Sequence, residues 1–540
     1  DQDSAIFNGI KLVISSIPLD LSGILFNGNG KTLNITNQSV YKTFVKGPSI
    51  KDIVISGLTL INNFDNIFSE SANDVQIYNC TFTTITTLSS GKTGLSANLG
   101  NAVATTVVKD STFNIRYNTI TFIQNVDYGG LIVNQLRASR FENVKINIST
   151  QNFTVSGNPT GVSLFVGSAE ISLISGVNVN LSAFSATMDL GSSSYGGLVY
   201  YAEESNITNF RFTTTMTNGQ GQLTINTEAT SAYIGMIAGH IKNTTISYIQ
   251  YNNYDITLNL GKTNTNTTAI EVFVGGIVAY MTKNSTIYQV NLRSSNTLTV
   301  VNNFKTSTNL SYATQEISIA GIVGKISNKS FNWNRNKGES ASRAVDVYSI
   351  TSSLELSVTL AKDISINKTA DDLALTQRCN IAGVIGSALN ARIADITSTQ
   401  LTLTVNFKGS MSNDATSNVN IAGVIGSMMY SEIAGELICS NSTFNVSISN
   451  DLRLSGYAQK VYIAYILANV GIQDSRNPIL TNSIYGEYYY NHCNKDNPKI
   501  LGNKHNIVCV TNSGSVVYNY SNNRNATSFL EINYTICPTS

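Results

Sequence analysis

Residues Ala320 to Lys325 read AGIVGK, and similar short apolar runs that begin with one or two small residues recur along the chain. An almost continuous apolar run of this length is typical of a strand in a buried parallel sheet. Small residues at one fixed place fit a close approach of neighbouring backbone. We therefore predict one buried strand per copy, stacked on the other copies. These are GGLIVN (Gly129 to Asn134), GGLVYY (Gly196 to Tyr201), GGIVAY (Gly275 to Tyr280) and AGVIGS (Ala382 to Ser387 and Ala422 to Ser427).

A second repeat, an apolar triplet at positions i, i+3 and i+5, follows the first by about ten residues. Of the 20 positions i+3 and i+5 in ten frames, 17 are apolar, against about 8 expected from a composition that is 42% apolar. Four successive starts are 33 residues apart, so the repeat is not an accident of composition. The frames start at Ile55, Ile77, Val108, Phe141, Ile174, Ile207, Ile246, Ile287, Ile393 and Ile433.

Position i+2 of these frames predicts a sharp bend. Asn, Asp and Gly enter the left-handed backbone conformation at the lowest cost, and one of them stands there in eight of the ten frames. Residues i and i+3 would then face inward from two strand segments joined at a corner. The eight are Gly57, Asn79, Asp110, Asn143, Gly176, Asn209, Asp395 and Gly435.

One unit of roughly 33 to 41 residues thus contains several short strands and their turns, which predicts a coil of a parallel β-solenoid. Leucine-rich and ankyrin repeats need helix-period segments, which this sequence lacks. Several β-sandwiches would need hairpin turns, yet Asn-Gly and Asp-Gly pairs between strands are scarce. The stretch from Trp333 to Arg378 interrupts the spacing, so we expect an insertion or a degenerate repeat there.

The G-[LI]-V-G core, seen best at Ala320 to Gly324, resembles the GLUG-type repeats of surface proteins. The opening SGILFNGNGKTLNI (Ser22 to Ile35) and the short coils at Ile55 and Ile77 resemble pectate-lyase-like right-handed parallel β-helices. The likeness covers roughly residues 28–471. It implies an all-β, right-handed parallel β-helix of about ten or eleven coils with a small Cys-containing C-terminal region. Folds of this kind include both enzymes and inert scaffolds.

We expect three regions: an N-terminal cap and first coil (1–48), the β-helix repeats (49–484) and a disulfide-containing tail (485–540). Disulfide candidates are Cys439, Cys493, Cys509 and Cys537, whose pairing the sequence does not choose. Cys80 and Cys379 are interpreted as buried thiols. The Tyr-rich segment Tyr485 to His492 fits a partner interface and a cover for the last coil equally well.

Only 12% of the residues are charged and the net charge is +1. There is no basic run that would attract nucleic acid or anionic lipid, and no apolar stretch reaches the roughly 18 residues of a membrane span. A polar, almost uncharged surface, an even number of cysteines and a first residue other than Met predict an extracellular or cell-surface glycoprotein. Glycosylation candidates are Asn34, Asn37, Asn79, Asn147, Asn152, Asn180, Asn206, Asn243, Asn266, Asn284, Asn309, Asn328, Asn367, Asn441, Asn445, Asn519, Asn525 and Asn533.

Catalytic chemistry finds little support in the sequence. A lyase or glycosidase would need converging carboxylates, and the outward positions of the triplet frames supply only Glu142. The pairs Asp371-Asp372 and Glu203-Glu204 are interpreted as turns. His240 is like the Gly-His of polygalacturonases, but the accompanying motifs are absent. Neither the Cys nor the His spacing predicts a metal site, so no cofactor is expected.

Threonine clusters at Thr81 to Thr87 and Thr213 to Thr217 could form an ice-binding face, but they do not recur in register in the sequence. A plain outward strand surface is favoured. The sequence therefore predicts a structural or adhesive element, such as a surface coat or filament subunit, that contacts itself, other surface proteins or glycans. The alternative is a carbohydrate-binding or carbohydrate-cleaving β-helix protein.

Overall fold

The computed structural model divides the chain into two compact units. Unit 1 comprises residues 1–225, 237–239 and 244–255, and unit 2 comprises residues 226–236, 240–243 and 256–540. The structure describes residues 23–35, 43–46, 50–69, 71–85, 94–95, 97–122, 126–182, 185–216, 219–250, 252–261, 266–267, 270–306, 315–328, 345–360, 378–407, 418–429, 431–433, 437–448, 460–464, 466–470, 484–486, 499–502, 507–513 and 531–536.

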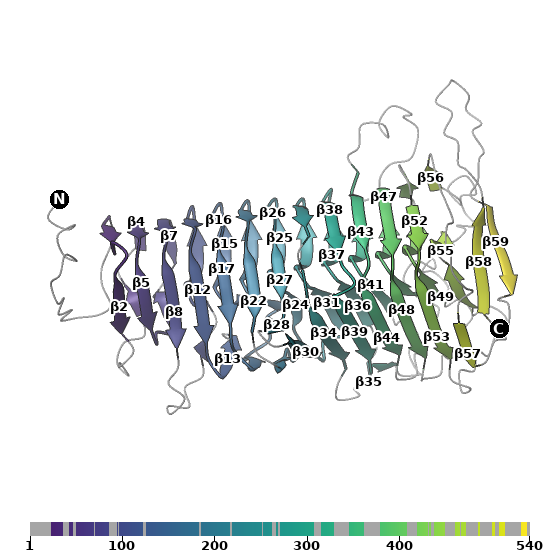
Figure 1. The fold of residues 1–540 in the computed structure, drawn as a ribbon, viewed down its shortest axis with the longest axis horizontal. Helices are drawn as coiled ribbons and strands as arrows, with labels where there is room; N and C mark the ends of the chain where they lie inside the picture. Colours follow the sequence, from purple (N-terminus) through teal and green to yellow (C-terminus); the bar gives the residue numbers. More distant parts are fainter. Residues whose placement is uncertain are drawn as a thin grey trace, which may run out of the picture. The chain divides into compact units, whose positions relative to one another are not determined.

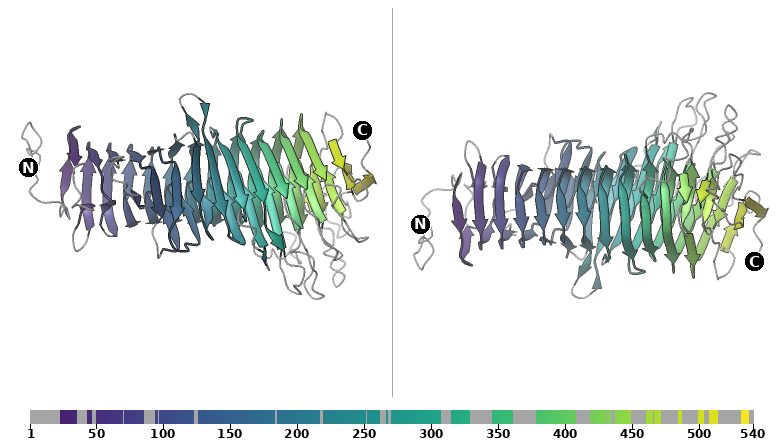
Figure 2. Two further views of the ribbon diagram at one scale, coloured as in Figure 1. Left: turned by 90° about the horizontal axis from the view of Figure 1, so that it is seen from below. Right: turned by 90° about the horizontal axis from the view of Figure 1, so that it is seen from above.

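All regular elements in these ranges are β-strands, so the fold class is all-β as expected. Within each unit the strands pair in parallel with the strands of the next pass of the chain, which we call a coil. The two views of Figure 2 show this stacking in the purple and blue strands of unit 1 and in the green strands of unit 2. The architecture is solenoid-like and repetitive. Among the described residues, no helix is long and apolar enough to cross a membrane.

In unit 1 one face is a parallel sheet whose strands follow one another in chain order (Figure 1). Most of these strands alternate buried and more exposed residues, because one side faces the core and the other faces solvent, whereas β8 and β27 each contain successive buried residues. The strands are β2 (Thr32–Ile35), β5 (Thr59–Asn62), β8 (Thr81–Ile85), β12 (Thr112–Arg116), β17 (Lys145–Ile148), β22 (Asn178–Leu181) and β27 (Arg211–Thr213).

The triplet repeat is confirmed as the register of a second sheet in unit 1. Each first residue pairs with the next first residue, and all are fully or almost fully buried. This sheet contains β4 (Ile50–Ser56), β7 (Ala72–Tyr78), β11 (Val107–Lys109), β16 (Arg140–Glu142), β21 (Leu173–Ser175), β26 (Asn206–Thr208) and β33 (Thr245–Ile249). The pairs run from Ile55 through Ile77, Val108, Phe141, Ile174 and Ile207 to Ile246.

The predicted bend at i+2 is also confirmed. Seven of the eight Asn, Asp and Gly positions have a positive φ, between 50° at Asp110 and 66° at Gly176, while Gly435 lies outside the described residues. Tyr248 and Gln289, which occupy i+2 in the two frames without such a residue, have φ values of 58° and 54°. The corner therefore forms even where the residue type does not favour it, because burial of i and i+3 requires it.

In unit 2 the interrupted stretch contains one further coil in register. Val347 pairs with Ile287 before it and with Ile393 after it, and Ile393 pairs with Ile433. The interruption at residues 333–378 is therefore one of spacing along the sequence, and the coil in this stretch keeps its place in the stack. The strands are β38 (Thr286–Leu292), β43 (Val347–Ser352), β47 (Arg392–Thr399) and β51 (Ser431–Ile433).

The Gly-led run was wrongly expected to be one strand, because it turns a corner. In unit 1, β14 (Tyr128–Gly130) ends before Leu131, and β15 (Val133–Arg137) begins after Ile132. Both bend residues are fully buried, which explains the unbroken apolar pattern. A Cβ on Gly130 would lie 1.9 Å from the carbonyl oxygen of Val133, so glycine is required where the chain folds back.

The same corner recurs in later coils, but the glycine at the corner is the second residue of GGLIVN and the first residue of GGLVYY. Gly196 takes the place of Gly130, and its Cβ would lie 2.0 Å from the Val199 oxygen. In unit 2, Gly275 is equally close to Val278. The strands after the corner are β20 (Val166–Glu170) and β25 (Val199–Glu203) in unit 1, and β32 (Ala238–Lys242), β37 (Val278–Thr282) and β42 (Val323–Ser327).

Near the C-terminus of unit 2, β58 (Ile507–Ser513) pairs antiparallel with β59 (Glu531–Ile536). Its other edge pairs in parallel with β54 (Lys460–Ala464). β59 therefore extends the same sheet by one strand, but it runs in the opposite direction to the parallel strands of the coils. Cys509 lies on β58, whereas Cys493 and Cys537 and most of the Tyr-rich segment lie outside the described residues.

Candidate functional site

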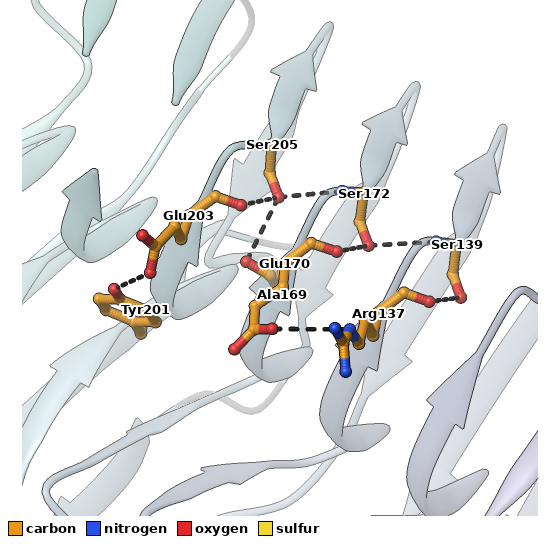
Figure 3. A network of polar contacts seen from close by, with 8 residues as sticks. All are labelled: Arg137, Ser139, Ala169, Glu170, Ser172, Tyr201, Glu203 and Ser205. Carbon is orange, nitrogen blue, oxygen red and sulfur yellow. Dashed lines mark hydrogen bonds and ion pairs between the residues drawn. The ribbon is translucent and has the colours of Figure 1, made fainter. Parts of the chain in front are cut away.

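A ladder of buried hydroxyl groups runs through the corner between two strands in successive coils of unit 1. The backbone N–H of Ser139 donates to the Ser172 hydroxyl at 3.2 Å, and the N–H of Ser172 donates to the Ser205 hydroxyl at 3.1 Å (Figure 3). Each hydroxyl donates in turn to a carbonyl two residues earlier in its own coil. The hydroxyl ladder consists of Thr106, Ser139, Ser172, Ser205 and Thr244.

These hydroxyls are structural. None is more than 5% exposed, and each satisfies a backbone group that the left-handed residue just before it turns away from the sheet. Sequence reasoning missed the ladder although a signal exists. Position i−2 of the triplet frame is Ser or Thr in six successive frames, from Thr106 to Ser285.

Asparagine amides form a second ladder on the outward side of the β12, β17 and β22 sheet. Asn147 donates to the Oδ1 atom of Asn114 at 2.9 Å, and the two residues are in register with Asn180. Asn180 accepts from the Thr213 hydroxyl at 3.0 Å. We call Asn114, Asn147 and Asn180 the amide ladder. Two of its members are glycosylation candidates whose side chains are only half exposed.

One row of threonines recurs in register on this sheet, although the cluster at Thr81 to Thr87 does not, because Thr83 and Thr84 pair with Asn114 and Ile115. Thr32, Thr59, Thr81 and Thr112 occupy one row of four neighbouring strands. The row then changes to Lys145, so the regular hydroxyl surface is short. Sequence spacing hid the row because the coils differ in length.

The outside of the Gly corner in unit 1 collects aromatic and charged groups. The rings of Tyr128 and Tyr201 stack at 5.4 Å with an interplanar angle of 12°, and the Tyr201 hydroxyl donates to Oε2 of Glu203 at 2.5 Å. Glu203 is in register with Glu170, and Glu170 is in register with Arg137 (Figure 3). We call Tyr128, Tyr201, Glu170, Glu203 and Arg137 the corner patch.

The corner patch is partly exposed and anionic. The Arg137 Nε atom lies 3.9 Å from Oε2 of Glu170, and the two side chains are 71% and 49% exposed, so solvent weakens this ion pair. The pKa of Tyr128 is raised by burial first and then by the negative charges of Asp127, Glu170 and Glu203. The sequence predicted a turn at the Glu203-Glu204 pair. In the structure Glu203 is the last residue of β25, and only Glu204, with a φ of 50°, belongs to the bend that follows.

The corresponding corner in unit 2 holds a cluster of rings, which we call the ring cluster: Tyr233, His240, Phe273 and Tyr280. Tyr233 stacks on Phe273 at 5.2 Å, and His240 stacks on Tyr280 at 4.9 Å. The His240 Nε2 atom lies 3.0 Å from the Thr282 hydroxyl. These neighbours pack and orient the imidazole.

Lys325 and Glu316 lie on the next coil of unit 2. The ammonium group pairs with Oε2 of Glu316 and lies 4.6 Å from the centroid of the Phe273 ring. The Ser387 hydroxyl donates to the other Glu316 oxygen at 3.2 Å. Because the carboxylate is 7% exposed and the lysine side chain 15%, this group is held firmly in place.

The described residues contain no group of three or more His, Cys, Asp or Glu side chains arranged to hold a metal ion. Glu142 contacts Arg140 beside it and no second carboxylate at that place. The structure does bring Glu170 and Glu203 together, which the triplet frames could not reveal because both residues lie on the preceding strand. Asp371-Asp372 lies outside the described residues.

Cys80 and Cys379 are buried free thiols, as predicted. The Cys80 Sγ donates to the Tyr78 carbonyl at 3.2 Å. Burial raises the pKa of both thiols, that of Cys379 to about 12. Cys439 is buried on β52 (Leu437–Ser440). The side chains of its candidate partners Cys493, Cys509 and Cys537 lie outside the described part of the chain, and its role in a disulfide stays a prediction.

The glycosylation candidates differ in accessibility. Asn328 is 4% exposed and exchanges amide-to-carbonyl hydrogen bonds of 3.2 Å with Asn390. Asn147, Asn180 and Asn445 are half exposed. The side chains of Asn34, Asn79, Asn152, Asn206, Asn243, Asn284 and Asn441 are exposed. The side chains of Asn37, Asn266, Asn309, Asn367, Asn519, Asn525 and Asn533 lie outside the described part.

No protein-family model matches the chain, and the searches of curated proteins and of solved structures found no match either.

Proposed function

We propose that the chain is an extracellular or cell-surface glycoprotein with a structural or adhesive role, such as a coat element or a filament subunit. The observation that supports it is the continuity of the ladders in unit 1. Thr106, Ser139, Ser172, Ser205 and Thr244 link five successive coils through buried side-chain hydrogen bonds. Such linking favours a rigid body that resists local opening and proteolysis.

Further parts of this proposal concern finer structure. The body would be a right-handed β-helix of about ten or eleven coils related to GLUG-repeat surface proteins, with a cap in residues 1–48 and a disulfide-containing tail in residues 485–540. The antiparallel β58–β59 pair supports a distinct end, because reversing the strand direction stops parallel stacking.

Electron microscopy of the native, non-reduced protein tests the proposal. A repeating fibre or sheet is the expected result for a filament or coat subunit. Limited proteolysis should leave the ladder-containing region of unit 1 intact. Dispersed particles at all concentrations, together with rapid cleavage between Thr106 and Thr244, would overturn the structural role.

Carbohydrate binding is a second candidate function, favoured by the ring cluster. Tyr233, His240 and Tyr280 are each partly exposed, and such rings stack on sugar faces while their polar tips bind hydroxyls. A glycan array with the wild type and with Tyr280→Leu tests it. Saturable binding that the variant loses supports this function, and no binding to any neutral or acidic glycan excludes it.

A further inference from the structure

We propose that the corner patch binds a primary ammonium group, presented as a lysine side chain of a partner protein. This names the partner chemistry for the adhesive part of the proposed function. The patch offers the two components that recognise such a group: ring faces, which attract cations, and carboxylates, which pair with them.

The described part of the chain contains an example of this recognition. In unit 2 the Lys325 ammonium lies 4.6 Å from the Phe273 ring centroid and pairs with Glu316. Lys325 is the sixth residue of its motif copy, AGIVGK, and Tyr201 is the sixth residue of GGLVYY. The sixth motif position therefore carries a cation at Lys325 and an aromatic ring at Tyr201 and at Tyr280, the residue that pairs with Lys325.

The geometry of the corner patch fixes its rings for such a contact. The Tyr201 ring is held by stacking on Tyr128 and by its hydrogen bond to Glu203. A Cβ on Gly161, the residue that pairs with Tyr128, would lie 2.3 Å from the ring of Tyr200. Glycine at this position leaves room for the Tyr200 ring, whose centroid lies 5.5 Å from that of Tyr128 and which further confines the Tyr128 ring, so that this ring needs little reordering when a ligand binds.

Charge selects the ligand class. Glu170 and Glu203 exceed Arg137, the one cation of the corner patch, by one negative charge, and Asp127, the neighbour of Tyr128 in the chain, adds a second. In a chain of net charge +1 this excess is local. The carboxylates repel an anionic ligand and offer an uncharged one only hydrogen bonds, whereas an ammonium group gains from the rings, the hydrogen bonds and the charges.

The test uses the full chain and N-acetyl-lysine amide as the probe, observed by saturation-transfer NMR at low salt. We expect saturable transfer to the ε-methylene protons that weakens as salt is raised. Glu170→Gln and Tyr128→Leu should each weaken binding about two- to fivefold, the usual size of an exposed cation–π or ion-pair contact.

Tyr288→Leu is the matched control, because Tyr288 stacks on Tyr348 at 5.0 Å in unit 2 and should not affect the probe. Equal transfer to N-acetyl-norleucine amide, which lacks the ammonium group, would overturn the proposal. So would unchanged binding in both patch variants, or preferential binding of a neutral oligosaccharide at the patch. Dispersed protein suffices, so failure here is distinct from failure to form filaments.

Discussion

The hydroxyl of Ser172 joins two coils, because it accepts the backbone N–H of Ser139 at 3.2 Å and donates to the carbonyl of Glu170 at 2.7 Å. The first bond is buried and the second partly buried, and Ser172 itself is 4% exposed. Ser172→Ala would leave a backbone donor and a backbone acceptor without this partner. We expect a loss of about 1–3 kcal/mol in the free energy of unfolding.

Urea denaturation of Ser172→Ala measures this loss. Ser175→Ala is the control, because Ser175 lies on the neighbouring strand β21 and is partly exposed, so its replacement should change stability by less than about 0.5 kcal/mol. Equal stability of the two variants would contradict a stabilising role of the hydroxyl ladder.

Gly130→Ala should prevent the Gly corner from forming. The added Cβ would lie 1.9 Å from the Val133 oxygen and 2.5 Å from the Gly167 nitrogen, both backbone atoms that cannot move without distorting two strands. Gly129→Ala is the control, since its Cβ would meet only side chains at 3.3 Å. We expect loss of soluble folded protein, judged by circular dichroism, for Gly130→Ala alone.

The triplet repeat could be predicted because burial imposes it. Ile55, Ile77 and Val108 are core residues, and a core-facing position tolerates few residue types. The bend was predictable for a different reason, since a positive φ at Asn79 or Gly57 favours a particular residue type. The path of the chain at Leu131 could not be predicted, because a buried corner and a buried strand are equally apolar.

The corner patch was hidden for a geometric reason. Tyr128 and Tyr201 are separated by two coils, and their contact depends on the length of each coil and on the glycine between them. The in-register pairing of Glu170 with Glu203 likewise needs the alignment of β20 and β25. A single sequence fixes neither coil length nor register outside its periodic positions.

Stability should fall between about pH 10 and pH 12 because of buried tyrosines. Burial raises the pKa of Tyr200 to about 12; the hydrogen bond with Ser194 lowers it by a smaller amount, and Tyr128 raises it by the smallest. In this window the unfolded chain loses the phenolic proton and the folded chain keeps it. The free energy of unfolding therefore drops by about 1.4 kcal/mol per pH unit for this residue.

Urea titrations at several alkaline pH values measure this slope. Tyr200→Phe removes the phenol that ionises, so the free energy of unfolding should fall less steeply with pH in this variant. The remaining slope comes from other tyrosines whose pKa values burial also raises, namely Tyr117, Tyr195 and Tyr254. An unchanged slope in the variant would show that Tyr200 ionises normally in the folded chain.

Cys80 and Cys379 should resist alkylation in the folded protein. Thiolate is the reactive form, and burial raises the pKa of both thiols while also blocking the reagent. We expect iodoacetamide at pH 8 to leave both unmodified until urea is added, as read by peptide mass spectrometry. Rapid labelling of Cys379 without denaturant would show that its coil opens readily.

Glycan occupancy, if the chain passes through a secretory pathway, should follow exposure. Asn79, Asn243, Asn284 and Asn441 are exposed and have φ values from 46° to 55°, so each amide stands at a corner where a glycan meets solvent. Asn328 is buried in reciprocal hydrogen bonds with Asn390, and a glycan there would separate two coils. Glycopeptide mass spectrometry of the folded, secreted protein should find the four exposed sites occupied and Asn328 bare.

Asn284→Asp should remove one glycan with little loss of stability, because Asp also tolerates the left-handed conformation at this corner. Asn328→Ala should destabilise the fold by about 1–3 kcal/mol, because it removes the amide that donates to the buried Asn390 carbonyl and accepts from the Asn284 N–H. A fully glycosylated Asn328 in folded protein would contradict the packing of this corner.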